Sequence, residues 1–339
     1  MMGYRDVFTD IEKGTIATLY LWYGEEEFVK DRALEALTEV LVEPGMGDLN
    51  YQALDGEEAG VAQIIEACDT LPFMAERRLV VVRDPYLLTG RKGTQSEQDG
   101  MTAYLAELPP SVCLVFYLRA AHKPDKRKAV YKAAAKHGSV VEFALLKEEE
   151  RARWVKRELS AQKIKMDTRT LHMFLARVGD SMQHVSSELD KLVQYAGVGG
   201  TVTGEMVTEV AVPTTEERVF DMLDAVGRRE LTHAMVSLDH LLAAGDEPLM
   251  IVTMLARQFR LMLLAKELKR RGVHPSRAAG EMGVAPWLAN KYADQAARFA
   301  PDTLIRGMET CVELNHGLKN GLKAKRESLE ALIVGLCQG

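Results

Sequence analysis

The feature that most constrains the fold is a change of pattern near residue 144. Before it, short apolar runs alternate with helical segments, and after it the pattern is helical throughout. The runs are rich in β-branched and aromatic residues and apolar on both faces, as buried parallel strands are. The expected strands are Thr18–Tyr23, Asn50–Leu54, Leu79–Val82, Val112–Leu118 and Val140–Phe143. The expected helices are Glu26–Leu41, Gly60–Thr70, Gln98–Leu108 and Lys126–Lys136. Residues 1–143 therefore predict an α/β domain with a parallel sheet covered by helices on both faces.

The next stretch, residues 144–212, predicts a small helical domain in which we expect no strand. Its first helix is the charged Lys147–Lys163, and the second begins at Asp167. Asp180 and Gln183 have the spacing of a capping box, in which two residues three apart bond each other's backbone N–H groups. We therefore expect Asp180 to open the third helix.

A second helical domain, residues 213–339, is expected to begin at Pro213. Thr214 and Glu217 have capping-box spacing, and Pro or Gly residues stand at the joints between helices. The expected helices are Glu216–Gly227, Glu230–Ala244, Glu247–Arg271, Pro275–Gly280, Ala285–Arg298, Pro301–Leu318 and Ala324–Leu336. The most apolar stretch, Met250–Leu264, contains two arginines, so we do not expect it to span a membrane.

Composition narrows the class of protein. Apolar residues make up 47% and charged residues 27% of the 339 residues, which is the balance of a soluble globular protein. The net charge is -6, whereas a protein that binds DNA alone over a large surface is usually basic. Any DNA contact is therefore expected to be local or shared with partners. The four cysteines are widely spaced, which argues against a zinc site or disulfides, and the absence of an apolar signal segment predicts a cytoplasmic protein.

The end of the first strand is where a nucleotide-binding protein with such a sheet would hold phosphate. A phosphate-binding loop reads G-x-x-x-x-G-K-[ST], but here Gly24 is followed by Glu25, Glu26 and Glu27. These carboxylates suit the positive end of a helix dipole and would repel a triphosphate. We interpret them as capping the helix, and no ATP site is expected.

Other patterns of catalytic or metal-binding residues are weak. Asp84 follows the third strand, where a magnesium-binding acid could stand, but it is interpreted as a turn residue before Pro85. His233 and His240 share one expected helix, and a metal site needs three or four converging ligands. No serine-hydrolase, zinc-protease or dinucleotide-binding motif is present. We expect no catalytic residue, cofactor or metal in this chain.

The most informative segment lies just before the third strand. Three apolar residues are bunched there beside Pro72, which stops the preceding helix: Leu71, Phe73 and Met74. One interpretation is a hydrophobic connection packed on the core. The other is an exposed apolar wedge that fits a partner's pocket. The wedge would have a charged rim made of Glu76, Arg77 and Arg78.

Several stretches occur in an order that is similar to one known family. In the N-terminal part they are Tyr23–Glu26, Leu54–Gly56 and Thr70–Val82, and further along they are Glu188–Tyr195, Arg257–Arg260 and the region of Leu318 and Lys319. Together they resemble the delta subunit family of the DNA polymerase III clamp loader over nearly the whole chain. The resemblance implies an AAA+-like α/β domain with a degenerate nucleotide site, a helical lid domain and an all-α collar domain.

The resemblance also implies a function. The chain would bind and open the β sliding clamp for loading onto primed DNA, with Leu71, Phe73 and Met74 as the clamp-binding residues. Met74 stands where the family often has a second Phe, and a flexible Met side chain can still fill a pocket. The implied partners are the clamp, the gamma/tau and delta-prime loader subunits and primed DNA, with no membrane. The chain would belong to the replisome in the cytoplasm and would not itself catalyse a reaction.

Two rival functions remain open from the residues. One is an active AAA+ ATPase, and the other is a helical AAA+-like adaptor or nucleic-acid-binding protein that never meets a clamp. Under the clamp-loader resemblance, some members of two basic clusters are candidates for contact with DNA: Lys123, Lys126, Arg127, Lys128, Lys132 and Lys136, and Lys319, Lys323, Lys325 and Arg326. Each cluster is either a solvated face or a contact to the phosphate backbone, and the sequence does not decide which.

Overall fold

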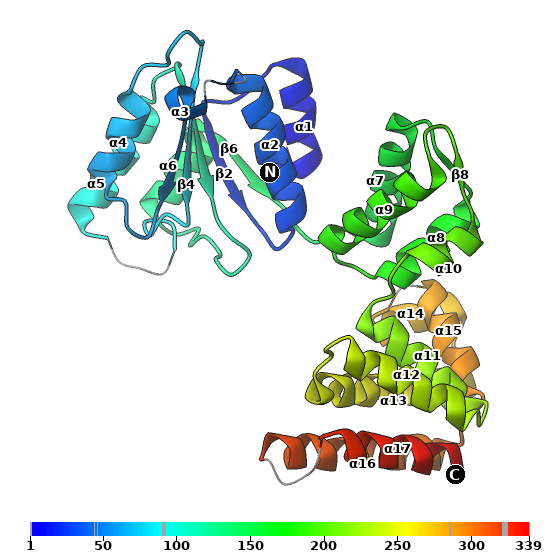
Figure 1. Ribbon diagram of the computed structural model, residues 1–339. Coiled ribbons are helices and arrows are strands. Elements are labelled where there is room, and N and C mark those ends of the chain that lie inside the picture. Colours follow the sequence, from blue (N-terminus) through cyan, green and yellow to red (C-terminus); the bar gives the residue numbers. More distant parts are fainter. Residues whose placement is uncertain are drawn as a thin grey trace. The chain divides into compact units, whose positions relative to one another are not determined.

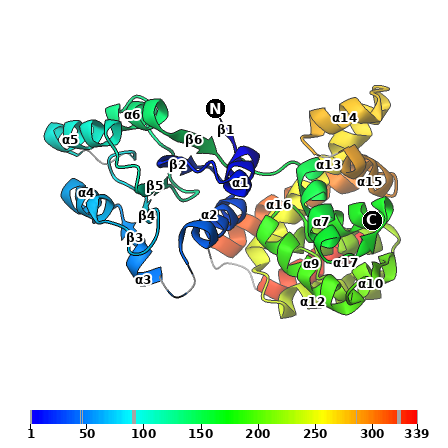
Figure 2. The same ribbon diagram turned by 90° about the horizontal axis from the view of Figure 1, so that it is seen from above.

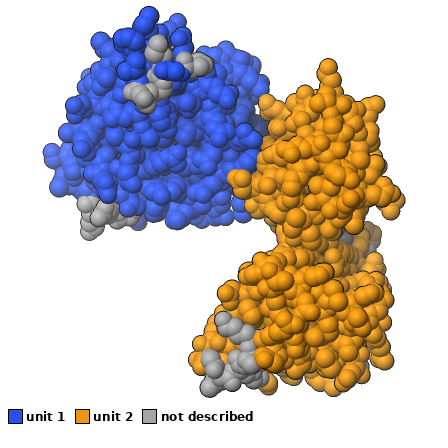
Figure 3. Space-filling view, viewed as in Figure 1, with its two compact units in different colours: residues 1–147 blue, residues 148–339 orange. Residues whose placement is uncertain are grey.

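The computed structural model of the chain describes residues 2–43, 45, 47–89, 93–284, 286–320 and 325–338. The chain forms two compact units, Met1–Lys147 and Glu148–Gly339, shown in two colours in Figure 3. We call them unit 1 and unit 2. The expected boundary at Pro213 lies inside unit 2, and the division into three domains stays a prediction.

Unit 1 is built on a six-stranded sheet. The strands are β1 (Met2–Gly3), β2 (Leu19–Tyr23), β3 (Tyr51–Asp55), β4 (Arg78–Arg83), β5 (Val112–Tyr117) and β6 (Ser139–Glu142). Their order across the sheet is β1-β6-β2-β5-β4-β3, and every neighbouring pair is parallel. The parallel sheet predicted from the alternating pattern is therefore confirmed.

Helices cover both faces of this sheet (Figures 1 and 2). They are α1 (Tyr4–Lys13), α2 (Glu27–Leu41), α3 (Gly47–Asn50), α4 (Val61–Asp69), α5 (Gln95–Ala106) and α6 (Ala129–His137). Successive strand residues point to opposite faces. Leu19 and Leu21 of β2 belong to the core beneath α4, α5 and α6, whereas the alternate residues Tyr20 and Trp22 are buried on the face that α1 and α2 cover. A strand buried on both faces must be apolar at every position, which is why β2 reads as a continuous run.

Two expectations for unit 1 are corrected. The strand β3 was expected to be buried on both faces, but it is an edge strand paired only with β4, and Ala53 and Asp55 are exposed. The charged N-terminal residues, which gave no expected element, form the amphipathic helix α1. Its buried side chains Val7 and Ile11 stand four residues apart on one face.

Unit 2 is mostly helical. Its first helices are α7 (Glu148–Ala161), α8 (Thr168–Val178), α9 (Met182–Ala196) and α10 (Gly204–Val210). The next are α11 (Thr215–Gly227), α12 (Leu231–Ala243), α13 (Pro248–Arg270), α14 (Pro275–Met282), α15 (Pro286–Ala296), α16 (Pro301–Lys319) and α17 (Lys325–Gln338). The expectation of no strand after residue 146 is wrong, because β7 (Lys165–Met166) and β8 (Thr201–Val202) form a short parallel pair. Strands of two residues carry no periodicity from which to predict them.

Side-chain caps fix where the helices of unit 2 begin. Thr214 accepts a hydrogen bond from the backbone N–H of Glu217, as its spacing predicted. Asp180 was expected to open α9, but Ser181 is the cap and accepts from the N–H of His184. Asp180 instead forms an ion pair with Arg151 at 2.6 Å. Asp and Ser are about equally good caps, so the sequence alone could not choose between adjacent residues.

The helix α13 belongs to the hydrophobic core that α11 to α17 form together. By length and composition it could span a membrane. Yet Leu255, Phe259 and Met262 are fully buried in a hydrophobic cluster whose described members run from Val219 to Cys337. The core helix of a helical domain can be as long and as apolar as a membrane-spanning helix. Burial in this cluster explains the apolar composition of α13.

One glycine in unit 1 is required by its surroundings. Gly24, directly after β2, has φ +124°, and a Cβ there would lie 2.2 Å from the carbonyl oxygen of Phe143. Gly14 also has a positive φ, +71°, but a Cβ there would meet nothing within 4 Å. A comparison of substitutions at Gly24 and Gly14 therefore separates the cost of steric overlap from the cost of backbone strain.

We therefore expect Gly24→Ala to destabilise unit 1 more than Gly14→Ala does. The Gly14 change carries only the left-handed backbone cost of about 1–2 kcal/mol, while Gly24→Ala must also displace the backbone at Phe143. The measurement is hydrogen exchange of the slowest β2 and β5 amides in the full chain, which reports unfolding of this unit. Equal effects of the two changes would show that the Phe143 contact relaxes freely.

Candidate functional site

The segment that connects α4 to β4 carries exposed apolar side chains. Leu71 is 79% exposed, Phe73 50% and Met74 78%. The interpretation that these three residues pack on the core is therefore wrong. They form a contiguous apolar group in the chain, which we call the apolar wedge, and an exposed group of this kind suits a partner's pocket.

The backbone beneath the wedge is held by residues outside it. The helix α4 ends at Asp69, and the N–H of the C-cap residue Thr70 donates to the carbonyl of Glu66. Met74 has φ +50°, a conformation that is uncommon for a residue with a side chain. The side-chain amide of Asn50, at the end of α3, bonds both the N–H and the carbonyl of Phe73. The exposed side chains therefore stand on a fixed backbone.

Only part of the expected charged rim around the apolar wedge is exposed. Glu76 is exposed. Arg78 is buried, and its guanidinium donates to the carbonyl of Leu49 and, at 2.7 Å, to the side chain of Gln52. Arg77 is half-buried and donates to the carbonyl of Ile16 at 2.6 Å. The expectation that Arg77 and Arg78 form part of an exposed rim is corrected, because Arg77 bonds the loop before β2 and Arg78 bonds α3 and β3.

The three glutamates after β2 were expected to cap α2, and this expectation is wrong for the residue at the N-cap position. Glu26, at the N-cap position, is buried and makes no side-chain cap bond. Its N–H donates to the carbonyl of Phe143 at 3.0 Å, and its carboxylate accepts from the N–H of Leu146 at 3.5 Å. The Glu27 carboxylate accepts from the N–H of Ala120 at 2.7 Å. Two carboxylates of the degenerate loop are thus bonded to the backbone of neighbouring loops.

A lysine that the sequence reasoning missed lies beside this loop. Lys30 follows Gly24 by six residues, the spacing of the lysine in a phosphate-binding loop, with Val29 and Asp31 in place of the second Gly and the Ser or Thr. This six-residue spacing from Gly24 is the sequence signal that could have identified Lys30. Lys30 is fully buried, and its ammonium donates to the carbonyls of Gly24 at 3.0 Å and Leu118 at 2.6 Å.

The surroundings of Lys30 hold it in place. Its ammonium lies 4.8 Å from the ring centroid of Tyr117, a cation–π distance. The hydroxyl of Tyr117 donates to the Asp31 carboxylate at 2.6 Å. Burial lowers the pKa of Lys30 from its ordinary value, although nearby carboxylates oppose this. The lysine therefore bonds the protein's own carbonyls where an ATPase would use it on phosphate.

Asp84 is a turn residue, as expected, and it is also the buried centre of a cluster with two partly exposed partners. It is fully buried with φ +49°. Its carboxylate accepts from the N–H of Arg119 at 2.8 Å, lies 2.7 Å from Nδ1 of His122, and bonds the Arg119 side chain. Burial would raise the pKa of Asp84, but the hydrogen bonds from Arg119 and His122 outweigh it and lower the pKa. Its oxygens are occupied by these donors.

A cavity of about 350 Å³ remains at this edge of the sheet. Glu25 and Glu142 contribute carboxylates to its lining, and Lys123 and Lys126 contribute ammonium groups. Lys123 forms an ion pair with Glu25 at 3.4 Å, and Lys126 lies 5.5 Å from the ring centroid of Tyr23. The lining has both signs of charge, unlike the uniformly donating cradle of a triphosphate site.

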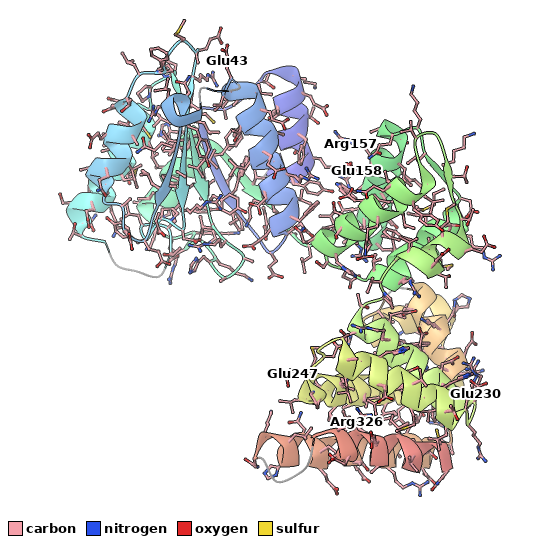
Figure 4. The ribbon with its side chains drawn as sticks, viewed as in Figure 1. Glu43, Arg157, Glu158, Glu230, Glu247 and Arg326 are labelled. Atoms are coloured by element: carbon pink, nitrogen blue, oxygen red, sulfur yellow. The ribbon has the colours of Figure 1, made fainter. Side chains whose placement is uncertain are left out.

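Some members of the two basic clusters are paired within the protein. Arg127 bonds Asp125, and Lys128 donates to the carbonyl of Thr89. Arg326, labelled in Figure 4, forms ion pairs with Asp239 at 2.6 Å and Glu330 at 2.7 Å. Lys323 lies outside the described residues. These contacts do not identify residues that bind DNA.

The histidine pair does not lead to a metal site. His233 lies 3.3 Å from the carboxylate of Glu230, its neighbour on the helix. Within the described part of the chain, no three His, Cys, Asp or Glu residues gather closely enough to hold a metal ion.

Comparison with known proteins places the chain in a family. The family model described as "DNA polymerase III, delta subunit" matches residues 20–144, and that of its C-terminal domain matches residues 216–336. The DNA polymerase III subunit delta of Bacillus subtilis is 27% identical over 98% of this chain and 96% of its own length. A probable DNA polymerase III subunit delta of Aquifex aeolicus is 23% identical over 78% of this chain and 75% of its own.

A solved structure agrees with these matches. The Bacillus subtilis DNA clamp loader delta protein superimposes with a TM-score of 0.64 at 26% identity, covering 99% of this chain and all of that one. The predicted fold class, an AAA+-like α/β domain followed by a helical remainder, is confirmed. The chain therefore belongs to the DNA polymerase III delta subunit family of clamp loader subunits.

Proposed function

We propose that this chain binds the β sliding clamp through the apolar wedge and stabilises it in an open form for loading onto primed DNA. The observation that carries the proposal is the exposure of Leu71, Phe73 and Met74 on a backbone that is itself held in place. Exposed aromatic and flexible apolar side chains are typical anchors for a partner's pocket. Opening then needs only a higher affinity for the open clamp than for the closed one.

The wedge lies at the amino ends of the parallel strands. Gly24, where a phosphate-binding loop would begin, lies at their carboxyl ends. The wedge precedes β4, whereas Gly24 follows β2, and the strands are parallel. A strand of six residues spans roughly 20 Å. The proposal therefore assigns ATP binding to neighbouring gamma/tau subunits, whose conformation controls whether the wedge can reach a clamp.

Assembly is assigned to residues 213–339. The cluster from Val219 to Cys337 gives this segment a hydrophobic core of its own, which supports a separate folding unit. We propose that it joins the gamma/tau and delta-prime subunits, with primed DNA held inside the complex in the cytoplasm. The chain would act by binding and not by catalysis.

The wedge is tested by Phe73→Ala. Truncating a central aromatic anchor commonly costs about 2–4 kcal/mol, or roughly 30- to 1000-fold in affinity, so clamp binding measured by surface plasmon resonance should weaken by that factor. Leu145→Ala is the matched control, since Leu145 is 60% exposed in the same unit at the other edge of the sheet. If Phe73→Ala lowers the melting temperature but the folded protein binds the clamp normally, the wedge is not the anchor.

The ATPase rival is tested by calorimetric titration. Because Lys30 and the loop carboxylates are bonded within the protein, we expect no magnesium-dependent ATP binding with a Kd below about 1 mM, which corresponds to −4.1 kcal/mol. A sliding-clamp titration of the same preparation shows that the protein is active. ATP binding with a micromolar Kd would contradict this expectation and support the interpretation of the chain as an active ATPase.

The division of roles is tested by a chain that ends at residue 212. This chain should fail to co-elute with the other loader subunits in size-exclusion chromatography, because the proposed assembly segment is missing. Its clamp affinity should equal that of the full chain. Protection of unit 1 amides from hydrogen exchange verifies that the shortened chain is folded, and assembly of this folded chain would contradict the assignment.

A further inference from the structure

The backbone of Phe73 is held by a single buried side chain. Asn50 is 1% exposed. Its Nδ2 donates to the carbonyl of Phe73 at 2.8 Å, and the N–H of Phe73 donates to its Oδ1 at 2.7 Å. The two residues are 23 positions apart. An Asn amide presents a donor and an acceptor side by side, so it pairs with the N–H and the C=O of one residue as a neighbouring strand would.

This pairing satisfies both backbone groups of Phe73 with one side chain. It also fixes the position and orientation of the two peptide units on either side of the Phe73 Cα. The next residue, Met74, has φ +50°, a conformation that persists where the surroundings impose it. The exposed aromatic side chain is therefore held on a backbone that would otherwise sample other conformations.

The support is reciprocal. Arg78, at the start of β4 beyond the wedge, donates to the carbonyl of Leu49, the residue before Asn50. The junction of α3 and β3 thus holds the wedge, and the far end of the wedge segment holds that junction. Leu49 is itself 45% exposed. Asn50 hydrogen-bonds the backbone of Phe73, so we expect its influence on a partner to act through the position of Phe73.

We propose that Asn50 is a positioning residue for the clamp-binding wedge. It keeps Phe73 in the conformation that enters the pocket of the clamp, so that the ordering cost of binding is met before contact. This inference rests on the proposed clamp-binding role of Phe73. If only about a tenth of the molecules hold the competent conformation without the amide, the apparent affinity falls roughly 10-fold.

The test is a double-mutant cycle in the full chain, with clamp affinity as one readout. Asn50→Ala should weaken binding roughly 10-fold in the wild-type background and have no further effect in the Phe73→Ala background. Residues that act through one another are non-additive in this way. Asn50→Asp is the second variant, since it keeps the shape and one acceptor but loses the donor to the Phe73 carbonyl, and it should weaken binding as well.

A second readout does not depend on the clamp. In Asn50→Ala, the backbone amide of Phe73 should exchange its hydrogen roughly 10-fold faster, while the β4 amides keep their protection. Val130→Ala, a cavity change in α6 on a buried residue, is the control for general loss of stability. It should leave both the Phe73 amide and the clamp affinity unchanged.

The outcomes separate the two ideas. If Phe73→Ala does not weaken clamp binding, the proposed anchor fails, whatever Asn50 does. If Phe73→Ala weakens binding but Asn50→Ala does not, or weakens it equally in both backgrounds, the positioning role is overturned while the anchor stands. An unchanged exchange rate of the Phe73 amide in Asn50→Ala also overturns the positioning role.

Discussion

Hydrogen bonding between parallel strands is the constraint on which unit 1 depends. Pairing of β2 with β5 and β6, and of β4 with β5 and β3, aligns all these strands in one direction. Every strand therefore begins at one edge of the sheet and ends at the other. The loops at the carboxyl edge lie where a nucleotide-binding protein with such a sheet would hold phosphate, and the loop before β4 at the amino edge carries the apolar wedge. The fold thus separates the two features by the length of a strand.

At the carboxyl edge several polar groups bond within the protein. Lys30 bonds the carbonyls of Gly24 and Leu118, and Asp84 accepts from Arg119. Lys30 stands at the spacing of the phosphate-binding lysine of an ATPase. Here its ammonium joins the loop after β2 to the loop after β5.

At the amino edge the balance is the reverse. The apolar side chains of Leu71, Phe73 and Met74 are exposed to water, which is unfavourable unless a partner covers them. Their backbone is tied down by Asn50, and Arg78 ties the segment to the residue before Asn50. Rigid presentation of exposed apolar groups lowers the ordering cost of association. The carboxyl edge therefore has polar groups that bond within the protein, and the amino edge has exposed apolar side chains that a partner can bury.

The sequence by itself determined the strands and helices with strong periodicity, the parallel α/β domain and the apolar character of residues 71–74. These follow from patterns within a few residues, where the spacing of apolar side chains dictates which faces must be buried. It misjudged β3 because an edge strand and a central strand can share one composition, and it missed β7 and β8 because two residues carry no period.

Only the tertiary structure decided whether the wedge is exposed or buried, and what holds it. Asn50 and Phe73 are 23 residues apart, and Lys30 and Leu118 are 88 apart. No local pattern encodes such a contact, because it exists only once the sheet has brought distant loops to one edge. Residues 71–74 have the same apolar pattern whether they pack in the core or are exposed to a partner. Which of the two occurs depends on the surfaces that the rest of the fold leaves uncovered.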